Sequence, residues 1–161
     1  MIIAMKYLGI DYGSKRVGIA VSDDAAMIAF PKKVIQNRGI DALVAEIGQF
    51  CVSEKIDEIV IGDSRDYHGR PNEIMKEIEG FSVVLQEEVK LPVHFQLEFM
   101  TSVQASRILE GGVPEGRQRG TSEGLKGSSA MLDAAAAALI LQSFLDAAGK
   151  DAAGKLDKKK A

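Results

Sequence analysis

The chain has little cysteine, little net charge and no long apolar run. Its only cysteine, Cys51, excludes an internal disulfide framework and is typical of a reducing cytoplasm. Cys51 falls on the apolar side of an expected helix, so we predict that it is buried in the core. No apolar run approaches the roughly 20 residues that cross a bilayer, and we expect no membrane association. The opening MIIAMK lacks the basic region and cleavage site of a signal peptide and indicates a first strand.

The net charge of −3 argues weakly against a general nucleic-acid coat protein, which is usually basic. It does not exclude a nuclease, because an acidic centre and a basic rim cancel in the sum. The two histidines, His68 and His94, stand apart and lack cysteine or histidine neighbours, so a zinc site is not expected.

Apolar periodicity and turn residues predict an α/β protein of one domain, residues 1–148, followed by a disordered basic tail, 149–161. We expect strands over residues 5–10, 17–21, 27–35, 57–62 and 91–98. Helices are expected from Asp41, over 71–90, from Thr101 and over 130–148, with a glycine-rich loop at 111–129. The first three strands form an antiparallel meander, and right-handed crossovers then add parallel strands. The result is a five-stranded mixed sheet with helices on both faces.

Three carboxylates stand where this topology brings residues together. Asp11 ends the first strand, Glu98 ends the fifth, and Asp133 lies in the first turns of the final helix, followed by small alanines. Converging carboxylates without basic partners favour a hard divalent cation, Mg²⁺ or Mn²⁺. Each residue has a simpler interpretation: Asp11 as a turn residue, Glu98 at a solvated edge, and Asp133 near the positive end of a helix dipole.

Three segments then show a resemblance: GIDYGSKRVGIAVSD, LEFMTS and LDAAAAALILQSFLD. Together they resemble the YqgF/RuvX family of RNase H-like Holliday junction resolvases, which are also implicated in maturing the 5′ end of pre-16S ribosomal RNA. The family's acidic motif positions fall on Asp11, Glu98 and Asp133. Leu97 and Phe99 replace the aspartate and arginine that flank the glutamate in the family. Asp63 stands where the family is apolar, which makes it a fourth candidate metal ligand.

Basic and small residues surround these carboxylates in the sequence. Lys15 and Arg16 follow the glycine turn after Asp11, either as a solvated turn or as phosphate contacts. The candidate nucleic-acid-binding residues are Gly13, Lys15, Arg16, Arg65, Arg70, Thr101, Arg117, Arg119 and Lys126.

These features predict a cytoplasmic, two-metal-ion endonuclease that acts on structured nucleic acid. Its expected partner is four-way junction DNA or pre-rRNA, and the sequence leaves open a monomer or a homodimer. One alternative is a non-catalytic RNA-binding or ribosome-assembly module. The other is an actin-like or sugar-kinase-like ATP-binding domain, because DYGSKRVGIAVSD also resembles the phosphate loop of that superfamily.

Overall fold

The computed structural model describes residues 4–65, 73–99 and 123–159. For four stretches within these ranges the backbone alone is described: 64–65, 98–99, 123–130 and 150–159.

The described strands form a single five-stranded sheet in the order β3-β2-β1-β4-β5. Its strands are β1 (Tyr7–Asp11), β2 (Arg16–Ser22), β3 (Ala29–Gln36), β4 (Glu58–Arg65) and β5 (Val93–Phe99). The meander β1-β2-β3 is antiparallel, whereas β4 runs parallel to β1 and β5 runs parallel to β4. This is the predicted mixed sheet. It places the carboxyl ends of β1, β4 and β5 at one edge, where sites gather in sheets of this kind.

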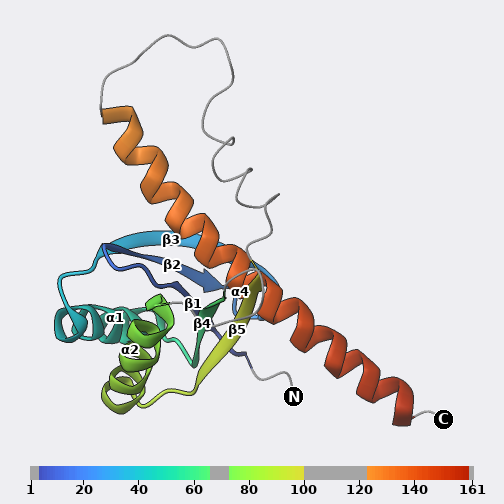
Figure 1. The fold of residues 1–161 in the computed structure, drawn as a ribbon. Helices are drawn as coiled ribbons and strands as arrows, with labels where there is room; N and C mark the ends of the chain where they lie inside the picture. The colour runs from blue at the N-terminus through green and yellow to red at the C-terminus, as the bar shows by residue number, and fades with distance from the viewer. Residues whose placement is uncertain (1–3, 66–72, 100–122, 160–161) are drawn as a thin grey trace, which may run out of the picture.

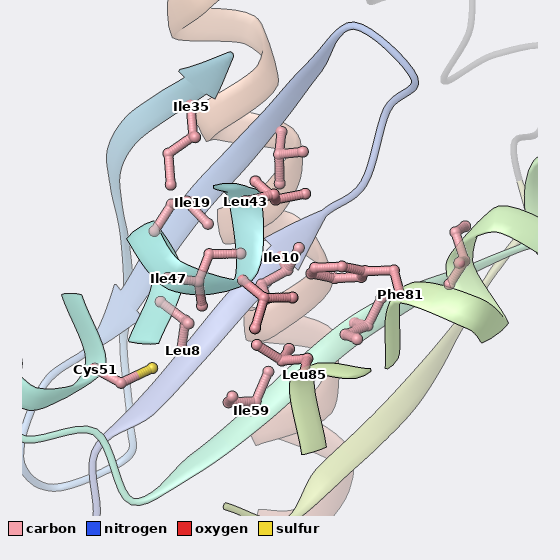
Figure 2. Close-up of a cluster of buried hydrophobic side chains, with 14 of the residues drawn as sticks. Leu8, Ile10, Ile19, Ile35, Leu43, Ile47, Cys51, Ile59, Phe81 and Leu85 are labelled. Carbon is pink, nitrogen blue, oxygen red and sulfur yellow. The ribbon is translucent and has the colours of Figure 1, made fainter. Parts of the chain in front are cut away.

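One face of the sheet is covered by α1 (Ile40–Glu54) and α2 (Glu73–Val89). Both helices connect parallel strands and bury an apolar side against them. Figure 2 shows their side chains, Leu43 and Phe81 among them, meeting Leu8 and Ile10 of β1. Cys51 is buried in the same cluster, as predicted, and burial raises the pKa of its thiol to about 11.

The other face is covered by α4 (Glu123–Lys159), which runs diagonally across the sheet and extends past it at both ends (Figure 1). Ala137, Ile140 and Leu141 are fully buried against Ala20 and Val60 of the strands. The helix segment Met131–Gly149 has the length and hydropathy of a membrane span, although no such run was expected. Its packing on the sheet explains part of that apolar character, because core helices share this composition.

Two expectations about α4 were wrong. The helix continues to Lys159, so helix replaces the predicted disordered tail, and residues 160 and 161 lie outside the described residues. It also begins at Glu123, so part of the predicted glycine-rich loop is helical. Asp133 therefore lies in the interior of a helix of 37 residues and not in its first turns. That position removes the helix-dipole interpretation, since the effect fades within the first turn.

The other boundaries differ from expectation by one to three residues. Helix α1 begins at Ile40 after Gly39 and not at Asp41, and β3 begins at Ala29. The helix expected from Thr101 lies outside the described residues.

Candidate active site

The candidate site lies where the end of β1 meets α4. Asp11 is the last residue of β1 and pairs with Gly18 of β2. Asp133 lies on α4, which packs on the face of the sheet opposite α1 and α2. Burial and, next, the negative charge of Asp133 raise the pKa of Asp11 to about 6. The structure therefore brings together two of the three predicted carboxylates.

Glycines on the strands allow α4 to come this close. A Cβ atom on Gly18 would overlap the backbone carbonyl of Asp133. A Cβ on Gly9 would lie 2.7 Å from the Cβ of Leu141 and 2.9 Å from the carbonyl oxygen of Ala137. Real Cβ atoms do not approach so closely, so glycine is required at both positions. The sequence analysis did not identify this role of Gly9 and Gly18. The signal was present, because both are small residues in strands and the final helix is rich in alanine.

Arg16 joins the carboxylate pair from β2. Its Nε lies 2.9 Å from Oδ2 of Asp133, at the distance of an ion pair. That oxygen is inaccessible to solvent and has no hydrogen-bond partner among the described residues. The Arg16 contact is therefore close without the alignment of a hydrogen bond. Oδ2 of Asp133 is thus a buried acceptor that has an ion-pair partner but no hydrogen bond.

The third predicted carboxylate, Glu98, is placed by its backbone. It pairs with Ser64 in the parallel register of β4 and β5. Glu98 is the second-last residue of β5, so its backbone lies at the edge of the sheet where β1 also ends. The Glu98 side chain lies outside the described part of the structure.

Asp63 does not join this group. It is buried and continues the parity of Ile59 and Ile61, which lie in the cluster under α1 and α2. Alternation therefore assigns Asp63 to the face opposite Asp11 and Asp133. The expectation placed Asp63 near the metal because it considered only the strand end and not the face.

The donor set suits a hard divalent cation. Asp11 and Asp133 supply carboxylate oxygens, one of them buried and without a hydrogen bond, and Mg²⁺ binds through one or two carboxylates and substrate phosphate. Among the side chains that the structure describes, no three of the usual metal ligands form a group; the side chain of the third candidate, Glu98, is not one of them.

Of the predicted nucleic-acid-binding residues, Gly13 and Lys15 lie in the β1–β2 turn. Asn37 holds this turn, donating from Nδ2 to the Gly13 carbonyl and from its backbone N–H to the Lys15 carbonyl. Arg16 opens β2, and the backbone of Arg65 ends β4. Lys126 lies on α4 with its side chain undescribed. Outside the described residues lie Arg70, Thr101, Arg117 and Arg119.

The fold is that of solved junction resolvases. Thermus thermophilus RuvC aligns with a TM-score of 0.51 and 18% identity, covering 90% of this chain and 97% of the other. A fowlpox virus resolvase, solved with Holliday junction DNA, aligns with a TM-score of 0.52 and 8% identity over 89% and 98% of the two chains. These likenesses define an RNase H-like fold, as the sequence resemblance implied.

Sequence comparison defines the family. Residues 5–147 match the RuvX family, described as Holliday junction resolvase, and the chain belongs to this family. A protein of Maridesulfovibrio salexigens named "Putative pre-16S rRNA nuclease" is 32% identical over 142 residues, covering 88% of this chain and 98% of its own length. A protein of the same name from Oleidesulfovibrio alaskensis is 36% identical, covering 88% and 92%.

Proposed function

We propose that this protein is a metal-dependent endonuclease that hydrolyses phosphodiester bonds in structured nucleic acid. The observation that carries the proposal is the pair Asp11 and Asp133, brought together by the glycine contacts of α4 at the edge where β1 ends and where Glu98 is the second-last residue of β5. Like charges held close together in a half-buried site cost stability unless cations compensate them, and Arg16 pairs only with Asp133. A fold does not retain such a pair for stability, so a function for it is expected.

Asp11, Asp133 and Glu98 would hold Mg²⁺ or Mn²⁺, in a site of two ions. The ions supply an activated water and neutralise the charge that develops on the phosphate. Asp11 and Asp133 contribute fixed oxygens, because β1 is central in the sheet and α4 is packed directly on it. Glu98 would complete the set from β5. Asp63, on the other face, is left out.

The substrate is either four-way junction DNA or the 5′ end of pre-16S rRNA. The family description and the names of the relatives support these two, respectively. We propose that Lys15 and Arg16 contact phosphates beside the scissile bond. Gly13 allows the chain to turn there. Arg65, Arg70, Thr101, Arg117, Arg119 and Lys126 would extend the contact outward. We further propose one nuclease domain over residues 1–148 that acts in the cytoplasm, as a monomer or a homodimer.

The test is a cleavage assay on both substrates with Mg²⁺, with Mn²⁺ and with EDTA, followed by mapping of the ends. We expect cleavage only with metal, leaving 5′-phosphate and 3′-hydroxyl ends. Asp11→Asn and Asp133→Asn should lower the rate by orders of magnitude. The matched control is Asp24→Asn, which removes one charge from an exposed turn away from the site. Cleavage that survives EDTA or either site variant would refute the proposal.

A further inference from the structure

The guanidinium of Arg16 occupies a position beside Asp133 that a bound metal ion cannot share. The site contains two carboxylates, Asp11 and Asp133, and the ion pair of Arg16 with Asp133 compensates one of them. Asp11 remains a half-buried neighbour of Asp133 without a described ion pair of its own. The arginine therefore balances half of the charge that a divalent cation would balance completely.

A bound cation and this ion pair exclude each other. The guanidinium lies 2.9 Å from Oδ2 of Asp133, and a cation coordinated by the same oxygen would be placed almost in contact with it. Like charges at such a distance repel each other, even in a half-exposed site. Arg16 is held only weakly against this repulsion, because its side chain is 45% exposed and the contact lacks hydrogen-bond alignment.

The position of Arg16 gives the released guanidinium a natural partner. Arg16 is the first residue of β2, directly after the exposed Lys15, at the edge of the sheet where the carboxylates meet. A guanidinium remains charged at every physiological pH and matches the oxygens of a phosphate with paired donors. A phosphate that approaches the metal passes this edge.

We propose that Arg16 is an exchangeable counter-ion. It neutralises Asp133 in the metal-free protein, yields that carboxylate to the metal, and then contacts a phosphate of the nucleic acid. Metal binding therefore precedes productive substrate binding and adds one phosphate contact to it. The inference rests on the proposed function, because it assumes that a divalent cation binds at this site.

The first test measures metal binding without nucleic acid. Titration calorimetry with Mn²⁺ compares the wild type with Arg16→Gln, which removes the competing charge and keeps a polar side chain. A partly exposed ion pair is weak, so the variant should bind Mn²⁺ about two- to fivefold more tightly. Lys15→Gln is the matched control, because it removes one positive charge from the adjacent residue and should tighten binding less.

The two possible failures differ in this experiment. If the wild type binds no divalent cation, the proposed function fails together with the inference. If the wild type binds Mn²⁺ and Arg16→Gln binds it equally or more weakly, Arg16 only supports the architecture of the site. The inference then fails alone. A melting curve identifies a variant that unfolds. Arg16→Met, which removes the charge and keeps the aliphatic stem, then replaces Arg16→Gln and should also bind Mn²⁺ more tightly than the wild type does; equal or weaker binding would overturn the inference.

The second test measures the salt dependence of binding to four-way junction DNA, with Ca²⁺ to prevent turnover and with EDTA. Each phosphate contact contributes about 0.9 to the slope of log K against log salt. The slopes of the wild type and of Arg16→Gln should differ by about this amount in Ca²⁺ and be equal in EDTA. Comparison in one buffer cancels the effect of Ca²⁺ on the DNA itself. Equal slopes in Ca²⁺, or the same difference in both buffers, would overturn the inference.

Discussion

Replacing Asp11 by asparagine should stabilise the metal-free protein at neutral and alkaline pH. The change removes one of two neighbouring half-buried negative charges and keeps the volume of the side chain. Burial, followed by the charge of Asp133, raises the pKa of the Asp11 carboxyl from 3.8 to about 6. The folded protein therefore holds a proton on Asp11 more tightly than the unfolded chain does.

The sign and size of the effect follow from this difference. A raised pKa contributes stability that is complete below about pH 4 and is lost as the pH rises through about 6. The two values differ by about 2 units, and each unit corresponds to about 1.4 kcal/mol. After allowance for partial exposure, we expect Asp11→Asn to gain about 1–3 kcal/mol at pH 8 and almost nothing at pH 4.

Urea unfolding in EDTA at several pH values measures this difference. The pKa of Asp23 is shifted in the opposite direction to that of Asp11, because backbone hydrogen bonds from Ile28 and Met27 lower it. That contribution is present in both proteins and cancels in the comparison. Asp24→Asn controls for net charge. Equal stability of the wild type and Asp11→Asn at pH 8, or a difference that does not change with pH, would refute the reasoning and return Asp11 to a turn role.

Three further predictions concern other parts of the molecule. Gly18→Ala should lower the free energy of unfolding by about 1–3 kcal/mol, because its methyl group overlaps the α4 backbone; Gly80→Ala, in open space on α2, should instead gain about 0.5–1 kcal/mol. A thiol reagent at pH 8 should label Cys51 only after unfolding, since the thiol is buried and its pKa is about 11; fast labelling of the folded protein would contradict this. Glu98→Gln should abolish cleavage while unfolding in urea as the wild type does, and a destabilised Glu98→Gln would indicate a structural role.

The sequence predicted the sheet because its signals are local. Short polar turns require antiparallel pairing in the meander, and helical crossovers require parallel strands afterwards. The same logic placed Asp11 and Glu98 at one edge of the sheet. The buried face of α1 was equally accessible, since Leu43, Ile47 and Cys51 repeat with the helical period.

The errors came from features that are not periodic. Residues 149–159 lack an apolar face, so packing could not predict a helix there. Their alanines and lysines are strong helix formers, and intrinsic propensity explains the continuation to Lys159. Asp63 was misplaced because a strand end fixes an edge of the sheet, whereas only register fixes the face. The ion pair of Arg16 with Asp133 joins residues far apart in sequence and required knowledge of which face α4 covers.

The contact between Gly18 and α4 also determines when the site exists during biosynthesis. Asp11 and Gly18 are synthesised close together, because they pair within one hairpin of short sequence separation. Asp133 emerges only after the whole sheet has been synthesised, on the helix that must dock against Gly9 and Gly18. A chain interrupted before α4 therefore carries Asp11 without Asp133 and an uncovered apolar face at Ala20 and Val60. The candidate site is thus assembled only in a chain that has been synthesised through α4.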